Sequence, residues 1–270
     1  MKNSEFIEFF LKIKEQSVAE LTLKSYKSCL TRYLQSNNAL EDLNPYEAQN
    51  IMFLMSDLSK ATQRRNLTIL KQYYNYAVKY RITADNPFAV VENPKKICSQ
   101  VIDYVIPENE LVILIKIIDS LNFFWQAFFN LAIDTGARRG ELVALRWDDV
   151  DITNSTVTIR HSAYCSGSCV RLKEPKGKKV RKILITKKSV FLLYRLKAKN
   201  NSEFIFASDK NNNSPINPSS ATHFWHRLLE NNGIKFYRLH DLRHTCATYL
   251  LKYGIDINTV RGRLGHSDLS

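Results

Sequence analysis

The stretch HDLRHTCATYLLKYGIDINTVRGRLGHSDLS, residues 240–270, decides the interpretation of this 270-residue chain. A helix is expected from His240 onward, and a second, short helix over INTVRGRLGH. His240 and Arg243 lie one helical turn apart, so both can face one phosphate. Arginine presents a planar fork of donors that fits phosphate oxygens, and histidine exchanges protons near neutral pH. The stretch therefore indicates a helical domain that can hold a phosphate group.

Other interpretations of these histidines stay open. His240 and His244 are spaced like a metal-binding pair on a helix, although the glutamate of the HExxH metalloprotease pattern is missing. A structural histidine that is satisfied within the fold is also common. His266 follows Gly265 near a helix end and is weak evidence by itself.

A second basic cluster lies upstream, in TGARRGE at residues 135–141. An apolar helix is expected to end at Gly136, and Arg138 follows at the start of the next turn. Glu141 comes three residues after Arg138 on the same helical face, where its carboxylate can orient the guanidinium. The alternative is a salt-bridged surface arginine at a helix junction.

A third cluster is the turn KEPKGKK, residues 173–179. It lies between segments 150–161 and 180–186, whose β-branched and partly alternating residues predict strands. A lysine at the tip of such a hairpin, Lys176, can reach into a groove and offer a charge or a proton. A solvated basic turn is the usual alternative.

The clusters carry more weight together than singly. Five basic donors stand out: Arg138, Lys176, His240, Arg243 and His266. The sequence has no carboxylate cluster suited to two metal ions and no GxxxxGK phosphate loop. Arginines can replace a metal cation by binding phosphate oxygens as charge builds in a transition state. The set therefore suits phosphoryl transfer with no metal and no cofactor.

The first ninety or so residues are expected to be helical. Apolar residues recur at helical spacing over 23–34. Asn44, Pro45 and Glu47 form a helix start, with a capping residue, a proline in the first turn and an acid at its third position. Another helix begins near Ser59.

A segment with two prolines and little periodicity follows, and Pro107 starts a new helix. We therefore expect a helical domain over 1–93 and a linker over 94–106. A mostly helical second domain with one β insertion is expected over 107–270.

Composition points to a polyanionic partner in a reducing compartment. Lysine and arginine number 39 against 26 acidic residues, giving a net charge of +13, which attracts nucleic acids. The five cysteines are scattered; Cys165 and Cys169 with His161 give too few ligands for a zinc site, so a loop with two thiols is favoured. No run is apolar and long enough to span a membrane, and the N-terminus is not a signal peptide. A cytoplasmic protein without a membrane partner is expected.

Three segments resemble motifs of the tyrosine recombinase, or phage integrase, family, in particular its Xer-like members. TGARRGELVALRWDDVD resembles the first-arginine motif, EPKGKKVRKILIT the β-hairpin lysine motif, and residues 240–270 the HxxR and LGH segment. SKATQRRNLTILKQYYNYAVKYRITADNPF, residues 59–88, is typical of the last helices of the family's SAM-like core-binding domain. The resemblance implies a mainly α fold, in which this domain precedes a mixed helical catalytic domain of the DNA breaking-rejoining type with a small β-sheet.

The resemblance also implies a role for each candidate. Arg138 and Arg243 would clamp the scissile phosphate. Lys176 would protonate the departing 5′ hydroxyl, His240 would act as general acid and base toward the nucleophile, and His266 would donate a hydrogen bond to the phosphate.

Supporting residues and partners follow in the same way. Glu141 would orient the first clamp arginine. The basic residues expected against the backbone of duplex DNA are Lys60, Arg64, Arg65 and Lys71. An intact protein of this kind would join DNA strands through a 3′-phosphotyrosyl link, as a homotetramer on paired sites.

The sequence departs from the family pattern in two places. Gly177 stands where the family usually has a threonine after the lysine, and Lys173 and Lys178 lie close to Lys176.

The nucleophile is the more serious departure. The family's tyrosine lies beyond the LGH histidine, and only four residues follow His266 in the sequence. Tyr249 and Tyr253 occupy positions that the family leaves variable. The chain as given is therefore expected to bind DNA and polarise the phosphate without cutting it. Two alternatives stay open: a non-catalytic remnant or regulator that occupies recombination sites, and a type IB topoisomerase-like enzyme.

Overall fold

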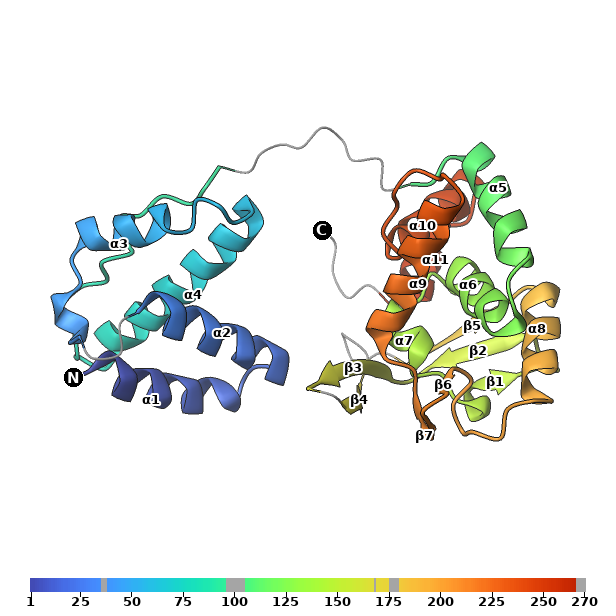
Figure 1. Ribbon diagram of the computed structural model, residues 1–270, viewed down its shortest axis with the longest axis horizontal. Helices are drawn as coiled ribbons and strands as arrows, with labels where there is room; N and C mark the ends of the chain where they lie inside the picture. Colours follow the sequence, from blue (N-terminus) through green and yellow to red (C-terminus); the bar gives the residue numbers. More distant parts are fainter. Residues whose placement is uncertain (35–37, 96–104, 168, 175–179, 266–270) are drawn as a thin grey trace. The chain divides into compact units, whose positions relative to one another are not determined.

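The computed structural model describes residues 1–34, 38–95, 105–167, 169–174 and 180–265. The chain divides into two compact units, Met1–Val101 and Ile102–Ser270 (Figure 1). This division falls inside the linker predicted over 94–106, most of which lies outside the described residues. The predicted domain limits therefore stay a prediction.

Unit 1 is built from helices, and the sequence predicts the starts of two of them. They are α1 (Asn3–Glu15), α2 (Glu20–Tyr33), the 3-10 helix η1 (Leu40–Asp42), α3 (Pro45–Phe53) and α4 (Lys60–Lys79). The Asn44 side chain accepts a hydrogen bond from the backbone N–H of Glu47, and the Ser59 side chain accepts one from that of Thr62. Both predicted helix starts are confirmed.

Aromatic side chains form the core of unit 1. Phe6 and Phe10 of α1 and Tyr73 of α4 are fully buried. The Tyr73 ring meets the two phenylalanine rings edge-on, with centroids 5.1 and 5.5 Å apart. This packing fixes the inner face of α4, and Lys60 and Arg65 consequently lie on its exposed face.

Unit 2 combines helices with small antiparallel sheets. Its helices are α5 (Glu108–Asp119), α6 (Phe123–Thr135), α7 (Arg139–Val143), the 3-10 helix η2 (Trp147–Asp149), α8 (Lys187–Lys197), α9 (Pro218–Asn231), α10 (Asp241–Lys252) and α11 (Ile257–Leu264). Its strands are β1 (Val150–Asp151), β2 (Thr156–Ile159), β3 (Ser162–Ser166), β4 (Cys169–Lys173), β5 (Arg181–Leu184), β6 (Ala207–Ser208) and β7 (Asn211–Pro215). They form a sheet of order β1-β2-β5 and the hairpins β3-β4 and β6-β7. This mainly helical architecture confirms the predicted fold class.

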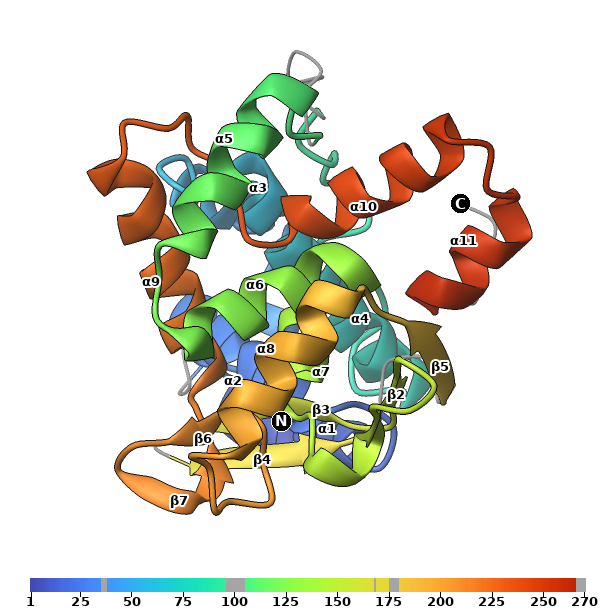
Figure 2. The same cartoon turned by 90° about the vertical axis from the view of Figure 1, so that its right-hand side faces the viewer.

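Helix α6 forms the centre of unit 2. Its side chains Ala127, Phe128, Phe129 and Leu131 are fully buried, so the helix is enclosed on most sides. Helices α8 and α10 both pack against it (Figure 2). Because α6 is enclosed, its C-terminal end is held firmly, and so are the residues that follow Thr135.

The β3-β4 hairpin differs from the sequence prediction. It lies in the Ser/Gly-rich stretch around Cys165 and Cys169, where the loop prediction is wrong. Gly167, at the turn, has a φ of +62°, which glycine adopts without strain. Val170 and Leu172 alternate along β4 and pack against the core of unit 2. This short period of two is obscured by polar neighbours, which is why the sequence did not reveal it.

Candidate functional site

Arg138 is the N-cap residue of the short helix α7. Helix α6 ends at Gly136, whose φ of +58° turns the chain directly into this position. The Glu141 carboxylate accepts hydrogen bonds from the Arg138 backbone N–H at 2.8 Å and from its Nη1 at 3.0 Å. The Arg138 side chain is 28% exposed, so its guanidinium is oriented by Glu141 and still reaches solvent. This geometry matches the support that the spacing of the two residues predicts.

Arg243 of α10 is buried beneath this site. Its Nη1 donates to the Gly136 carbonyl at 2.7 Å and its Nη2 to the Leu264 carbonyl at 2.6 Å. Burial, followed by the positive charge of Arg138, lowers the pKa of Arg243 to about 10. The guanidinium is therefore still charged at neutral pH and is held between the ends of α6 and α11.

Arg138 and His240 line one recess in unit 2. The recess has a volume of about 540 Å³, and its basic lining side chains also include Arg139, Lys173 and Arg238. We call it the basic recess. It opens beside the end of α6, so two of the predicted site residues face the same hollow, which is lined with positive charge.

His240 is the N-cap residue of α10. The ring of His244 meets it edge-on, with centroids 5.0 Å apart. Burial lowers the pKa of His240 below its usual value, and the positive charges of His244 and Arg243 lower it further. The imidazole is therefore neutral at neutral pH, the form that can accept a proton.

Two predicted site residues, Lys176 and His266, lie outside the described residues. On one side, β4 ends at Lys173, which lines the basic recess. On the other side, α11 ends at Leu264, whose carbonyl is bound by Arg243. Lys173, three positions before Lys176, thus lies at the basic recess, and Leu264, two positions before His266, contacts Arg243.

Sequence reasoning missed Arg181, the first residue of β5. Its Nη2 and Nη1 donate to the Glu141 carboxylate at 2.5 and 3.4 Å, and its Nε donates to the Arg263 carbonyl at 2.8 Å. The Arg181 side chain is only 7% exposed. An arginine of the sheet therefore shares the carboxylate that orients Arg138.

The strand pattern around Arg181 explains why it was missed. Arg181, Ile183 and Ile185 are buried, whereas Val180 and Leu184 are 63% and 64% exposed. Apolar residues occur on both faces of this strand, so the sequence allows either face to be the inner one. The signal that could have identified Arg181 is its alternation with Ile183 and Ile185, which places all three on one face of the strand.

The four basic residues predicted on α4 have different surroundings. Lys60 and Arg65 are exposed. Arg64 is partly buried, and its Nη1 has no hydrogen-bond partner among the described residues. The Lys71 ammonium donates to the Val91 carbonyl at 2.8 Å. Only the first two present their charge chiefly to solvent.

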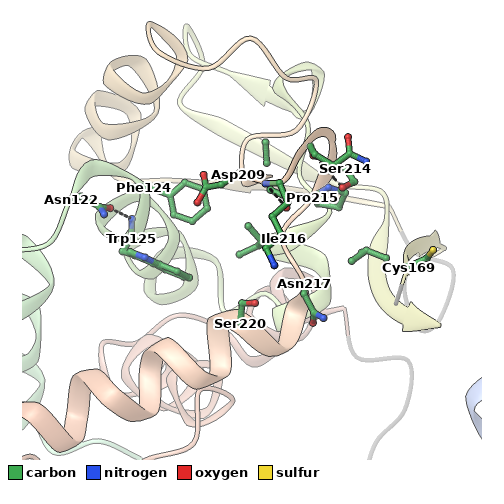
Figure 3. Close-up of a pocket in the computed structure, with 15 residues that line it drawn as sticks. Asn122, Phe124, Trp125, Cys169, Asp209, Ser214, Pro215, Ile216, Asn217 and Ser220 are labelled. Carbon is green, nitrogen blue, oxygen red and sulfur yellow. Dashed lines mark hydrogen bonds between the residues drawn. The ribbon is translucent and has the colours of Figure 1, made fainter. Parts of the chain in front are cut away.

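A larger hollow of about 870 Å³ lies elsewhere in unit 2, beside the β6-β7 hairpin and the N-terminal ends of α6 and α9 (Figure 3). Phe124, Trp125 and Ile216 line it together with polar side chains such as Asn122 and Asn217. Among the described residues that line it, none is a predicted site residue. Size alone therefore does not identify the site in this protein.

Two kinds of feature are absent from the described ranges, a membrane-spanning helix and a metal-binding cluster. Within them, no helix combines the length and apolar character that crossing a membrane requires. Nor do they contain a group of three or more histidine, cysteine or acidic side chains that could hold a metal ion.

The proteins that this chain resembles in sequence are phage integrases and tyrosine recombinases. The sequence model of the Phage integrase family matches residues 104–270. The chain is 26% identical to tyrosine recombinase XerD of Oceanobacillus iheyensis over 275 residues, which cover 97% of this chain and 88% of the relative. It is 28% identical to tyrosine recombinase XerC of Bacillus licheniformis over 283 residues, covering 98% and 88%.

Solved structures share the fold over nearly the whole chain. The Tn1549 transposon integrase in complex with circular intermediate DNA superposes with a TM-score of 0.80 at 17% identity, covering 100% of this chain and 93% of that one. The lambda integrase tetramer bound to a Holliday junction gives a TM-score of 0.77 at 19% identity, covering 99% and 78%. At such identities the likeness establishes the fold alone.

Proposed function

Because the chain belongs to the phage integrase family, we propose that it recombines duplex DNA at specific sites by cutting and rejoining strands. The relatives named tyrosine recombinases support this activity. The observation that carries it is the arrangement of Arg138 and Arg243, two arginines fixed by the fold around the end of α6. Such a pair binds the scissile phosphate through its non-bridging oxygens.

The arginines supply the charge that a metal ion supplies elsewhere. A guanidinium has five N–H donors, and Arg243 uses two groups on the carbonyls of Gly136 and Leu264. The remaining donors, with those of Arg138, can follow the phosphate as its oxygens gain negative charge. Because the protein already holds both side chains, little reorganisation is needed in the transition state.

Proton transfer falls to the histidine and lysine candidates. His240 is neutral at neutral pH because its pKa is lowered, so it accepts the proton of the attacking hydroxyl. The family resemblance supports Lys176 as the acid that protonates the departing 5′ oxygen, and His266 as a donor to the phosphate. These two assignments rest on sequence motifs.

The attacking group in this scheme is a tyrosine hydroxyl. Its oxygen bonds to phosphorus as the bond to the 5′ oxygen breaks, so one phosphodiester replaces another and no ATP is consumed. The hydroxyl of Tyr249 donates to the Ile106 carbonyl at 3.1 Å, and that of Tyr253 donates to Glu108 at 3.4 Å. Both hydroxyls are already hydrogen-bonded at the start of α5, so we assign the nucleophile to neither of these two tyrosines.

Duplex DNA is the proposed partner of both units. Lys60 and Arg65 would contact the phosphate backbone from unit 1. Arg64 and Lys71 are partly buried and would lie behind these two side chains. Such contacts position a protein on DNA and carry little sequence information. Assembly as a tetramer on paired sites is proposed by analogy with the lambda integrase tetramer.

The experiment first selects bound duplexes from a random pool and then places a nick next to the scissile position. The protein from the complete reading frame should form a covalent adduct with this DNA, and the adduct should be lost in Arg243→Ala. Binding that shows no sequence preference, or an adduct that survives in Arg243→Ala, would refute the proposal. Selective binding without an adduct from the complete frame would favour a DNA-binding regulator.

A further inference from the structure

Arg181 lies where three segments of unit 2 meet. It contacts Glu141 in α7 and the Arg263 carbonyl in the last turn of α11. It also packs against the turn at Gly265, where an added Cβ would lie 3.1 Å from the Nη1 and 3.4 Å from the Cδ of Arg181. The sheet, α7 and α11 are therefore joined through one side chain.

The Glu141 carboxylate is shared by two arginines. Its Oε1 accepts from Arg138 Nη1 at 3.0 Å and from Arg181 Nη1 at 3.4 Å. Its Oε2 accepts from the Arg138 backbone N–H at 2.8 Å and from Arg181 Nη2 at 2.5 Å. Burial would raise the pKa of Glu141, but Arg181, and to a smaller extent Arg138, lower it overall. Arg181 is therefore the main partner that keeps this fully buried carboxylate charged.

The same end of α11 is bound by both buried arginines. Arg181 binds the Arg263 carbonyl, and Arg243 binds the next one, that of Leu264. These carbonyls have no partner within the helix, since helices leave their last carbonyls unpaired. Arg138 and Arg243 are thus both connected to the C-terminal end of α11. Arg243 binds this end directly, whereas Arg138 is connected to it through Glu141 and Arg181.

We propose that Arg181 is a positioning residue for phosphoryl transfer: it fixes Glu141, and through it Arg138, relative to the helix end that holds Arg243. The inference rests on the proposed function for its effect on strand exchange. Arginine suits this position because its planar fork makes two bonds to the carboxylate while Nε makes a third to the carbonyl. Lysine would keep the charge but could not reproduce the three fixed bonds.

The test compares variants of the protein from the complete reading frame. Arg181→Gln removes the charge and the fork, and Arg181→Lys restores the charge alone. Arg160→Gln is the control for loss of an arginine that pairs with a buried acid: the half-exposed Arg160 has its Nε 3.0 Å from the carboxylate of Asp149. Glu141→Gln and the double variant with Arg181→Gln complete a cycle. Urea unfolding checks each variant, and Arg181→Lys carries the comparison if Arg181→Gln does not fold.

The expected result is a split between rate and affinity. Strand exchange at saturating DNA should slow by about 100-fold in Arg181→Gln, the cost of misplacing a reacting group by an ångström or so. DNA affinity should change by less than about 3-fold, because backbone contacts elsewhere supply most of it. Arg181→Lys should recover part of the rate, and Arg160→Gln should keep it. The double variant should be no slower than the slower single one, because both changes break one link.

Hydrogen exchange of the DNA-free protein gives a second readout that does not depend on activity. Arg181→Gln should accelerate amide exchange over 138–142 and 261–265, and Arg160→Gln should not. Equal acceleration in both variants, or rate losses that multiply in the double variant, would overturn the proposal. If the wild-type protein exchanges no strands, the proposed function fails, and the hydrogen-exchange comparison still decides whether Arg181 positions α7 and α11.

Discussion

The basic residues of α4 and those around Arg243 differ in what holds them. On α4, Lys60 and Arg65 extend from an exposed face. In unit 2, the guanidinium groups of Arg181 and Arg243 are buried and bound to backbone carbonyls, and Arg181 also to a carboxylate. Burying a charge is costly unless hydrogen bonds replace its water, so a fold keeps such arginines only with partners in place. The comparison separates exposed basic side chains, proposed to attract DNA, from buried arginines whose geometry the protein itself fixes.

Arg243→Ala should produce the largest effect. It removes a fixed donor aimed at charge that develops in the transition state, which typically costs about 100- to 1,000-fold in rate. Single-turnover cleavage of a nicked duplex at saturating DNA measures this, and filter binding measures affinity. If affinity falls as steeply as the rate, Arg243 acts as an ordinary backbone contact, and the contrast with α4 is lost.

Glu141→Gln should have the next largest effect, which is a loss of stability. The variant leaves the guanidinium groups of Arg138 and Arg181 around a neutral amide, and breaking a buried ion pair on one side costs about 3–5 kcal/mol. Urea unfolding of unit 2 measures the loss. A loss of unfolding free energy below about 1 kcal/mol would mean that water replaces the carboxylate as partner of the two arginines. Their arrangement would then not be fixed by the fold.

The α4 residues should show the opposite pattern. Lys60→Ala and Arg65→Ala each remove one phosphate contact, which should lower the salt dependence of DNA binding by about one unit of slope. Stability should stay within about 0.5 kcal/mol, because both side chains are exposed. Titration of binding against salt concentration checks the slope. The rate of strand exchange at saturating DNA should be unchanged. A lowered rate would contradict the view that the α4 residues contribute to DNA affinity alone.

The smallest expected effect concerns pH. The charges of His244 and Arg243 lower the pKa of His240, after burial, so His244→Gln should raise it. Because the folded state disfavours the proton, the stability from neutral His240 is complete above the usual pKa of 6.5 and is lost as pH falls through the folded value. Cleavage should decline over the same acidic range. NMR titration of the His240 ring follows the shift, and an unchanged midpoint in His244→Gln would exclude coupling between the two rings.

The comparison also shows what the sequence can predict. Arg138 with Glu141, and the helix starts at Asn44 and Ser59, depend on spacings of three residues, and the structure has them where the sequence predicts them. Arg181 could not be found in this way, because its role depends on which face of β5 is buried and on α11, about eighty positions later. Local patterns thus predict the elements and one local pair, whereas the link between distant segments requires the tertiary fold.

We propose that the fold holds Arg243, and Arg181 which positions Arg138, in place before DNA arrives, and side-chain NMR relaxation of the DNA-free protein tests this most directly. The account predicts that the Nε–H groups of Arg181 and Arg243 are as rigid as folded backbone, with order parameters near 0.85, whereas that of Arg65 falls below about 0.6. Equal mobility of all three side chains would contradict it, because the arginines would then be ordered by DNA rather than by the protein.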